Sequence, residues 1–354
     1  MAAIEPPVTT THGTTSHGTT THGTTTHDTT ARVGTTRARP TVPPSHADLV
    51  DSPLPGLLTT ELTSGRLQTS VVWYWTDGAD VLISTMTEFA KARNLRARPR
   101  ATLLVLAPDG RWVELRAHVA EDDDPDPMAS LDAVGVRYTG AAPYFGAIVP
   151  VHLAEDEHPV TFRLVPTAVV VGPTSPAAPR GGRARLTTDP GCGGGSGAGT
   201  ATEPDGAVPP DAWAPGLPIP ASHVDLLDRP ILAALSTRLP DGAAQTQPVW
   251  CAREGDDVLL TTTAERRKGR NLAADPRATL VVVDPANSSR WLELRADAEV
   301  TTEGAETLAD RLAREYTGAP AFYGHVAPSG LRGLETRVVV RLRARRIVCD
   351  AIHA

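Results

Sequence analysis

Lysine is almost absent from this 354-residue sequence: of its 34 basic residues only Lys91 and Lys268 are lysines, and the others are arginines. Acidic residues outnumber basic ones, and the net charge of −7 gives the chain no general attraction to nucleic acid or anionic membranes. The sequence also lacks an apolar run long enough to span a bilayer and the charged-then-apolar order of a signal peptide. We therefore expect a cytoplasmic protein with neither a nucleic acid nor a membrane as its partner.

Cysteine is scarce as well. Cys192, Cys251 and Cys349 are odd in number, far apart and in no Cys-x-x-Cys pair. This pattern argues against both a disulfide framework and a zinc site, because each needs cysteines in matched sets. A reducing compartment fits this usage.

Two segments are poor in the apolar residues that a core requires. Residues 1–44 are predicted to be a disordered tail, in which residues 9–30 repeat a Thr-His-Gly-Thr-Thr unit. Residues 173–221 form a linker rich in Gly, Pro, Ala and Ser. The histidines of the tail recur every five residues from His12 to His27, a spacing that fits neither a helix nor a strand. Weak metal binding by this tail is left open, because imidazole is a common ligand.

The rest of the chain is a tandem duplication. Residues 45–172 (the first repeat) and 222–354 (the second repeat) carry the same short motifs in the same order and at nearly the same spacing. The matching segments are 45–51 and 222–228, 68–73 and 245–250, 98–103 and 275–280, 112–117 and 291–296, and 138–141 and 316–319. The period is too long for a solenoid, so we expect one domain present twice.

Each repeat reads mostly as short strands. In the second repeat they are predicted at 258–262, 279–283, 291–300 and 337–348. The alternation in 291–300 places the small and apolar side chains from Leu292 to Ala298 on one face. Many short strands with few helices favour a mainly β (α+β) domain built as a small antiparallel barrel.

Two helices per repeat interrupt these strands. One follows Thr87 and Thr263 and ends before Pro99 and Pro276. The other is marked by apolar residues at helical spacing, which are Leu308, Leu312 and Tyr316 in the second repeat and, more weakly, Leu131 and Tyr138 in the first.

The first of these helices carries the two lysines. A strand that runs through a Thr-rich turn into a helix collects free backbone N–H groups and the positive end of the helix dipole, and a cation there completes an anion site. The second repeat adds Arg266, Arg267 and Arg270 around Lys268. Lysine at both equivalent positions of an arginine-rich chain indicates that a compact point charge is needed there. A merely solvated basic helix face is the alternative.

Tryptophan stands on the non-core face of the alternating strand. Trp291 shares that face with Glu293 and Arg295, and Trp112 occupies the same position in the first repeat. Because a large aromatic side chain needs a cover, we expect this face to form a surface between the repeats. Cover by a ring-shaped ligand, or an exposed tryptophan in a cation–π contact with arginine, is the alternative. In the strand 245–251, Pro248 predicts an edge or a bulge with backbone groups left for a ligand.

The usual catalytic motifs are missing. The sequence contains no nucleophile elbow, dinucleotide-binding glycine motif, P-loop or His-Glu-x-x-His zinc motif. His46 and His223 precede a further short helix at the start of each repeat, and they are interpreted as capping or packing residues. We therefore expect any chemistry to be carried by a bound cofactor.

The segment 261–280 reads Thr-Thr-Thr-Ala-Glu-Arg-Arg-Lys-Gly-Arg-Asn-Leu-Ala-Ala-Asp-Pro-Arg-Ala-Thr-Leu, and Trp-Leu-Glu-Leu-Arg and Arg-Glu-Tyr-Thr-Gly follow at 291–295 and 314–318. Together these motifs resemble the pyridoxamine 5′-phosphate oxidase-like split β-barrel family, most closely the branch that uses the deazaflavin F420. Such proteins are typically homodimers that bind a flavin or deazaflavin between two barrels. The resemblance implies two tandem split β-barrels of the FMN-binding type, packed as an internal pseudo-dimer. Further homo-oligomerisation is left open.

The resemblance also implies a set of cofactor-binding residues and no metal site. Those of the second repeat are Lys268, Arg266, Arg270, Thr262, Gln247, Pro248, Val249, Trp250 and Trp291, and those of the first repeat are Lys91, Arg93 and Trp112. The cations would hold the cofactor phosphate, the strand 247–250 would run beside the ring, and Trp112 or Trp291 would lie near the opposite repeat's site. The first repeat departs from the pattern, because Phe89 and Ala90 stand where the second has Arg266 and Arg267.

The implied function is an F420-dependent oxidoreductase that transfers a hydride to an unidentified small organic acceptor. The extra arginines around Lys268 suit the longer anionic tail of F420 through charge-assisted pairing. An FMN-dependent oxidoreductase of the same family, or a non-catalytic binder of flavin, F420 or heme, is the alternative. Oxidation of vitamin B6 is not expected, because no C-terminal segment that grips pyridoxal phosphate follows residues 345–348.

Overall fold

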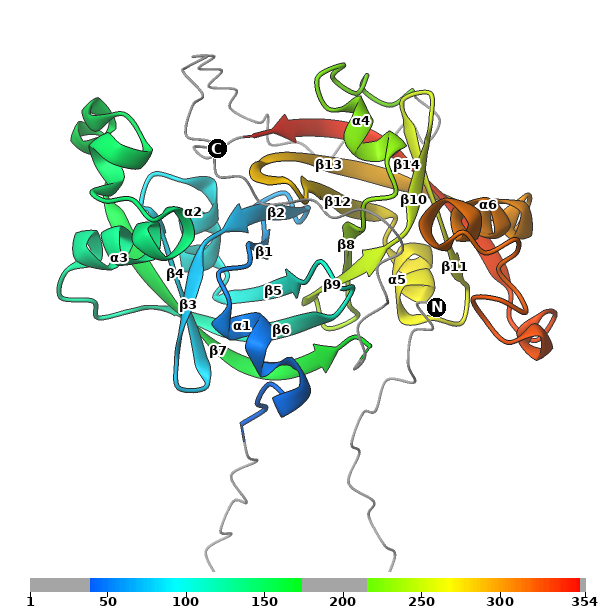
Figure 1. Cartoon of the computed structure of the whole chain (residues 1–354), viewed down its shortest axis with the longest axis horizontal. Coiled ribbons are helices and arrows are strands. Elements are labelled where there is room, and N and C mark those ends of the chain that lie inside the picture. The colour runs from blue at the N-terminus through cyan, green and yellow to red at the C-terminus, as the bar shows by residue number, and fades with distance from the viewer. Residues whose placement is uncertain (1–38, 174–214, 351–354) are drawn as a thin grey trace, which may run out of the picture.

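The computed structural model describes residues 39–173 and 215–350. They form two seven-stranded antiparallel sheets, one per repeat, with the same strand order (Figure 1). The first sheet runs β2-β1-β5-β6-β7-β4-β3 and the second, in equivalent strands, β9-β8-β12-β13-β14-β11-β10. The duplication and the mainly β architecture are thus confirmed. Most of the predicted tail and linker, with Cys192, lies outside the described residues.

The strands and helices of the two repeats correspond one to one. In the first repeat they are α1 (Ala47–Asp51), β1 (Gly56–Glu61), β2 (Leu67–Val72), β3 (Tyr74–Asp77), β4 (Asp80–Met86), α2 (Ala90–Ala97), β5 (Arg100–Leu106), β6 (Trp112–Glu121), α3 (Pro127–Thr139) and β7 (Pro159–Val171). In the second they are α4 (Val224–Asp228), β8 (Ala233–Arg238), β9 (Ala244–Val249), β10 (Cys251–Glu254), β11 (Asp257–Thr263), α5 (Arg267–Ala274), β12 (Arg277–Asp284), β13 (Asn287–Thr301), α6 (Ala305–Thr317) and β14 (Arg337–Cys349). Short turns of tighter or irregular helix occur at Pro44–His46, Tyr144–Ile148, Val151–Glu155 and Ser329–Leu331.

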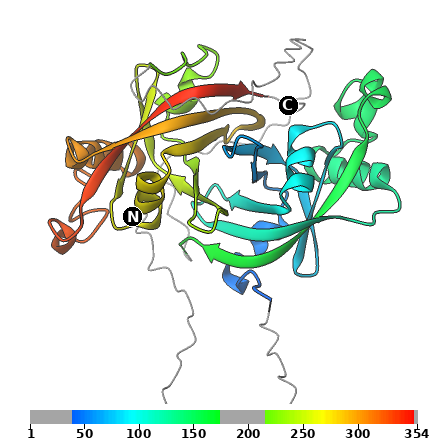
Figure 2. The same ribbon diagram turned by 180° about the vertical axis from the view of Figure 1, so that it is seen from behind.

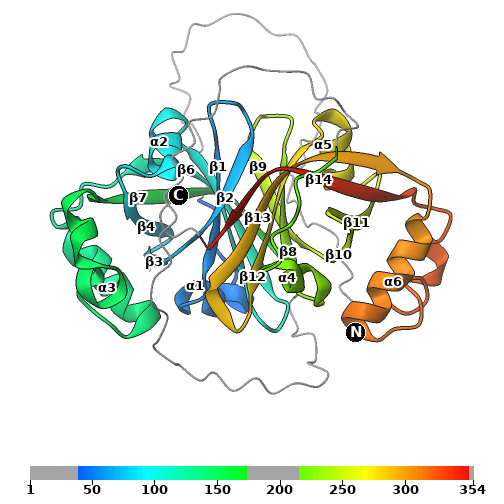
Figure 3. The same cartoon turned by 90° about the horizontal axis from the view of Figure 1, so that it is seen from above.

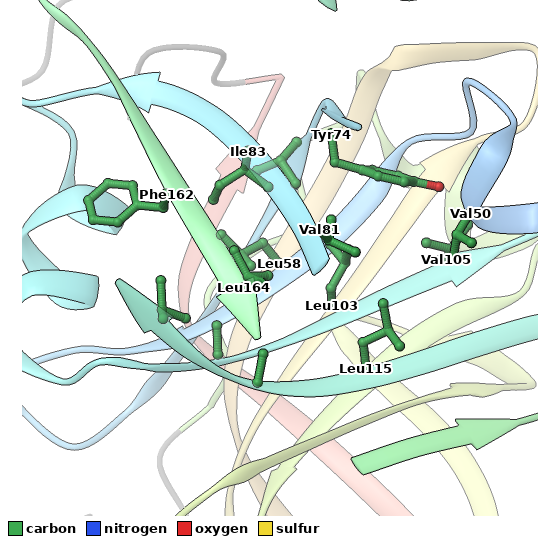
Figure 4. Close-up of a cluster of buried hydrophobic side chains, with 14 of the residues drawn as sticks. Val50, Leu58, Tyr74, Val81, Ile83, Leu103, Val105, Leu115, Phe162 and Leu164 are labelled. Carbon is green, nitrogen blue, oxygen red and sulfur yellow. The ribbon is translucent and has the colours of Figure 1, made fainter. Parts of the chain in front are cut away.

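Each sheet curls around its own apolar core. In the first repeat Tyr74, Ile83, Leu103 and Phe162 are fully buried and point into this core (Figure 4). In the second repeat the apolar side chains of β13 from Leu292 to Ala298 lie in the equivalent core, as the alternation predicts. Period-2 patterning was therefore sufficient to identify the inward face of this strand.

The helices lie where the sequence predicts them. Helices α2 and α5 end just before Pro99 and Pro276, and α3 and α6 end at Gly140 and Gly318, which adopt the positive φ that a helix C-terminus favours. The long helices α3 and α6 cover the outer ends of the molecule (Figures 1 and 3). Among the described residues, no helix has the length and apolarity needed to cross a bilayer.

The two repeats lie side by side and share a buried seam (Figures 2 and 3). Strands β1, β2, β5 and β6 contact β8, β9, β12 and β13 there. At its centre four hydroxyl groups, those of Thr59, Thr69, Ser236 and Thr246, hydrogen bond to one another at distances up to 3.0 Å. Two of these residues come from each repeat, so the seam has the pseudo-twofold symmetry of a dimer.

The face of β6 and β13 opposite the core is buried in this seam, as expected. Trp112 packs against Ala234 and Val281 of the other repeat. Glu293 accepts a hydrogen bond from the backbone N–H of Thr69 at 2.8 Å, and Glu114 is placed symmetrically, with its partner N–H at 3.4 Å. Burial raises the pKa of both carboxyl groups, although the neighbouring arginines oppose this effect.

The two histidines that precede α1 and α4 are packing residues. His46 and His223 are buried, and neither side chain caps its helix. Their rings instead hydrogen bond to Pro173 and Asp350, at the far end of each repeat. The interpretation of the two histidines as packing residues is therefore confirmed, and their interpretation as helix caps is wrong. Each ring hydrogen bonds to a residue at the end of its repeat and not to the start of the helix.

Candidate functional site

A cavity lies at the seam, between the lysine-bearing helix α5 and the hairpin that joins β5 to β6. Both repeats form its walls: Gly110, Trp112 and Pro173 come from the first, and all other lining residues come from the second. Its enclosed volume is about 140 Å³, and it opens to solvent at its mouth. Small-molecule sites are typically clefts of this kind, lined by apolar and aromatic side chains with a few polar groups.

The cationic end of the cavity is the junction between β11 and α5. Lys268 lies in the first turn of α5, where unpaired backbone N–H groups and the positive end of the helix dipole gather, and its side chain is only 8% exposed. Arg266, at the N-cap position, lines the cavity beside it. Together they place two positive charges at a helix N-terminus, an arrangement that suits a phosphate or carboxylate.

Thr262 completes this end. Its hydroxyl oxygen is buried and has no hydrogen-bond partner among the described residues. A buried hydroxyl without a partner costs about 1–3 kcal/mol, so a ligand oxygen that accepts from it would remove this penalty. The residues at the β11–α5 junction therefore fit an oxyanion.

The residues of the repeated Lys-x-Arg-Asn-Leu motif have different structural roles. Asn271 donates from its amide to Thr237 and Gln245, and Leu272 is buried in the core, so both anchor α5 on the sheet. Arg270 points away from the cavity and donates to the backbone carbonyl of Glu265. Only the lysine of the motif lines the cavity.

The aromatic end is built on the strand junction between β9 and β10. Trp250 stacks on Tyr316 of α6, with ring centroids 5.2 Å apart and an angle of 19° between the planes. The Tyr316 hydroxyl donates to the carbonyl oxygens of Ile231 and Cys251, which fixes the stack in place. Pro248 lies in β9, an edge strand of its sheet as predicted, and lines the cavity with Val249. This end offers flat apolar surfaces to a planar ring.

A third wall comes from the segment between α6 and β14, which the sequence analysis missed. Arg337 lies 4.1 Å from the ring centroid of Phe322, and its guanidinium also bonds Tyr323 and Glu335. Glu335 in addition lies 3.9 Å from Arg266. Arg337 therefore brings a third cation to the cavity, held in place by an aromatic ring and a carboxylate. The available signal was a difference between the repeats, since Pro159 stands at the equivalent position.

The structure brings seven of the twelve implied residues to this cavity. They are Lys268, Arg266, Thr262, Pro248, Val249, Trp250 and Trp112. The other five are Arg270, Gln247, Trp291, Lys91 and Arg93, which do not line it. Trp112 reaches the cavity across the seam, while Trp291 is buried at the symmetric position. The roles of all twelve stay predictions.

The equivalent place in the first repeat has a different lining. Phe89 stands where Arg266 would be and packs with Trp73 and Tyr144 in an apolar cluster. Lys91 lies beneath it, with its ammonium nitrogen 4.8 Å from the Phe89 ring centroid. Burial lowers the pKa of Lys91 from 10.5 to about 8, which the charge of Glu157 only partly opposes. The first repeat thus keeps the lysine but surrounds it with apolar groups.

Chemically, the cavity of the second repeat combines an oxyanion end with a ring-binding end. Its described lining contains no carboxylate, histidine or cysteine. General acid–base and nucleophilic catalysis rely mainly on such groups, so the lining is suited to binding and orienting a reactive ligand.

Comparisons with known proteins bear on this arrangement. The family model described as Pyridoxamine 5'-phosphate oxidase matches residues 42–165 and 219–348. No curated protein sequence matches the chain. Solved structures similar to it include an F420 reductase (28% identity, 37% of this chain and 98% of that one, TM-score 0.33). A conserved hypothetical protein from Mycobacterium tuberculosis (24%, 38% and 86%, TM-score 0.31) and HupZ from Group A Streptococcus (19%, 37% and 93%, TM-score 0.28) are also similar.

Proposed function

Because the chain belongs to the pyridoxamine 5′-phosphate oxidase family, whose fold binds flavin-type cofactors, we propose that it is an F420-dependent oxidoreductase. The observation that carries this proposal is the cavity at the seam, where a cationic helix N-terminus and an aromatic wall face the same space. The bound deazaflavin supplies hydride transfer to a small organic acceptor. The protein's own residues bind, orient and desolvate.

The cationic end is assigned to the cofactor phosphate. Lys268 supplies a compact positive charge, Arg266 a guanidinium, and Thr262 a hydroxyl that has no hydrogen-bond partner in the described part of the chain. Arg337 adds a further cation on the other side of the cavity. Arg266 and Arg337 lie near the carboxylate of Glu335, and the charge of Lys268 acts on the buried Glu114. Three cations gathered around one cavity suit a cofactor with a long polyanionic tail, and this is the reason to favour F420 over FMN.

The aromatic end is assigned to the ring system. Pro248 and Val249 form one wall, and Trp112 comes from the other repeat. Such apolar walls exclude water from the ring, which protects a hydride donor from side reactions. A cavity that needs Trp112 cannot be built by the second repeat alone, so cofactor binding requires both halves of the chain.

The direct test is a titration of the purified full chain with F420 and, separately, with FMN. We expect F420 fluorescence to be quenched at one equivalent per chain and FMN to bind more weakly. Reduced F420 is then mixed with a panel of quinones and enones, and its oxidation is followed by absorbance. Tighter binding of FMN would replace F420 with the flavin alternative. F420 binding without turnover on any acceptor would favour a carrier, and no binding of either cofactor would refute the proposal.

A further inference from the structure

A second cleft opens at the seam, away from the cavity just described. It lies between strands β1, β5 and β6 of the first repeat and the tip of the β8–β9 hairpin of the second. Its enclosed volume is about 50 Å³. Since one water needs about 10–15 Å³ by the same measure, the cleft holds a few waters or one small polyatomic ion.

The walls of this cleft are rich in positive charge. Arg98, Arg100, Arg116 and His118 line it, against one lining carboxylate, Glu61. Glu61 is shared by two guanidinium groups, at 3.4 Å from Arg98 and 3.3 Å from Arg238. These two cations already balance the negative charge of Glu61, so Arg100 and Arg116 add further positive charge to the cleft.

The other two arginines keep donors available. Arg116 bonds the buried Glu114 through one nitrogen at 2.8 Å. Arg100 donates to the backbone carbonyl oxygen of Asp241 at 3.2 Å, and no ion pair involves it among the described residues. A neutral carbonyl leaves the charge of Arg100 uncompensated.

At the pseudo-equivalent position in the second repeat, side chains that pair with one another stand where the first repeat has the cleft. There Arg66, on the β1–β2 hairpin, donates to Asp297 at 2.9 Å, and Asp297 also accepts from Arg345 at 2.8 Å. The equivalent residues around the cleft are Ala243, His118 and Thr167. Ala243 therefore stands at the position equivalent to Arg66, and His118 at the position equivalent to Asp297, whose carboxylate bridges the two arginines. The cleft exists because the first repeat lacks this internal salt bridge.

We propose that this cleft binds a phosphate-sized oxyanion, which supplies the negative charge that the Asp297 carboxylate supplies in the second repeat. Arg100 and Arg116 are its principal donors, and His118, at the position equivalent to Asp297, also lines the cleft. The anion stands between the two repeats, since the hairpin of Gly242 and Ala243 closes one side. It is too small a site for a flavin or a nucleotide, and it does not depend on the function proposed for the larger cavity.

Inorganic phosphate is the probe, measured by isothermal titration calorimetry on the full chain. All proteins carry Lys268→Met, so that phosphate binding at the larger cavity is weakened throughout. We expect one saturable phosphate per chain and a phosphate-dependent rise in Tm. Arg100→Gln should weaken phosphate binding at least tenfold. The matched change Arg277→Gln, at the pseudo-equivalent arginine that is paired with Asp275, should leave the affinity within about twofold.

A second variant fills the cleft from inside. The double change Ala243→Arg with His118→Asp copies the Arg66–Asp297 pair and should abolish phosphate binding while the protein stays folded. Unchanged affinity in either Arg100→Gln or the double variant would overturn the proposal. So would the absence of a saturable phosphate in the Lys268→Met protein, or an equal loss of affinity in Arg277→Gln.

Discussion

The two repeats share one backbone plan and one lysine, yet they surround that lysine differently. In the second repeat Lys268 lies at the edge of an open cavity with Arg266 and Arg337 nearby. In the first repeat Phe89 and Pro159 stand at those two positions, and Lys91 lies under an aromatic ring. The comparison shows that a duplicated motif retains its fold even where its electrostatic environment has been lost. Fold is carried by the asparagine and the leucine of the motif, and charge by its neighbours.

The buried ammonium of Lys91 costs stability, because the effect of burial is larger than the opposing charge of Glu157. The lowered pKa of Lys91 means that the folded first repeat binds its proton less tightly than the unfolded chain does. We expect cofactor binding to depend on Lys268 more than on Lys91. The four predictions that follow compare matched positions in the two repeats.

The largest expected effect concerns the two lysines. Lys268→Met should weaken F420 binding about 10- to 100-fold, because a charge-assisted contact to phosphate contributes about 1.5–3 kcal/mol. Lys91→Met should change the affinity less than twofold. Fluorescence titration of both variants checks this. Equal losses would show that the two repeats bind the cofactor equally and would end the comparison.

The same Lys91→Met change should stabilise the protein. The shift of the Lys91 pKa from 10.5 to about 8 corresponds to a cost of about 3 kcal/mol below pH 8, so we expect a gain of about 1–3 kcal/mol at pH 7. Between about pH 8 and 10.5 the unfolded chain holds this proton and the folded chain does not, so wild-type stability rises with pH across that window. Denaturant unfolding from pH 7 to 10.5 measures the difference between the two proteins. It should shrink towards zero as the pH rises, and a difference independent of pH would contradict this account.

The helix start provides the third comparison. A Cβ atom on Gly269 would lie 2.2 Å from the carbonyl oxygen of Thr263, whereas the first repeat has Ala92 at this position. Gly269→Ala should therefore displace α5, at a cost of about 1–3 kcal/mol, and weaken F420 binding. The control Ala92→Gly should cost about 1–2 kcal/mol through backbone entropy and the loss of a buried methyl group, and leave binding unchanged. Thermal unfolding and F420 titration test both, and a Gly269→Ala protein with wild-type Tm would show that the backbone yields easily.

The smallest effect is expected at the threonine that ends the strand. Thr262 and Thr85 are equivalent, and both hydroxyl oxygens are buried without a partner in the described part of the chain. Replacing either by valine should leave stability unchanged or slightly raised, because an unsatisfied group is removed. Thr262→Val should also lower F420 affinity about three- to tenfold, and Thr85→Val should not. If both variants bind as wild type does, the Thr262 hydroxyl makes no contact with the cofactor.

Much of the fold followed from local pattern. The repeated segments, the alternation in β13 and the proline stops of α2 and α5 all lie within a few residues of the features they predict. The site was harder to predict, because its residues come from widely separated parts of the chain. Arg270 and Arg93 looked equivalent to Arg266 in sequence, yet both donate to a nearby backbone carbonyl instead. Arg266 stands at the N-cap with an extended backbone, whereas Arg270 lies inside the helix, so the rule that residues four apart share a helix face does not apply to this pair.

The sequence by itself determined that the chain is one domain twice, mainly β, with a lysine at the start of a short helix in each copy. Only the tertiary structure decided that Trp112 crosses the seam, that Arg337 joins the cations and that one arginine-lined cleft stays open. Periodicity and helix ends are encoded over a few neighbouring residues, so they can be read directly from the sequence. Whether residues from distant parts of the chain meet in one site depends on how the two curled sheets pack against each other. That arrangement arises from many weak contacts between residues far apart in the chain.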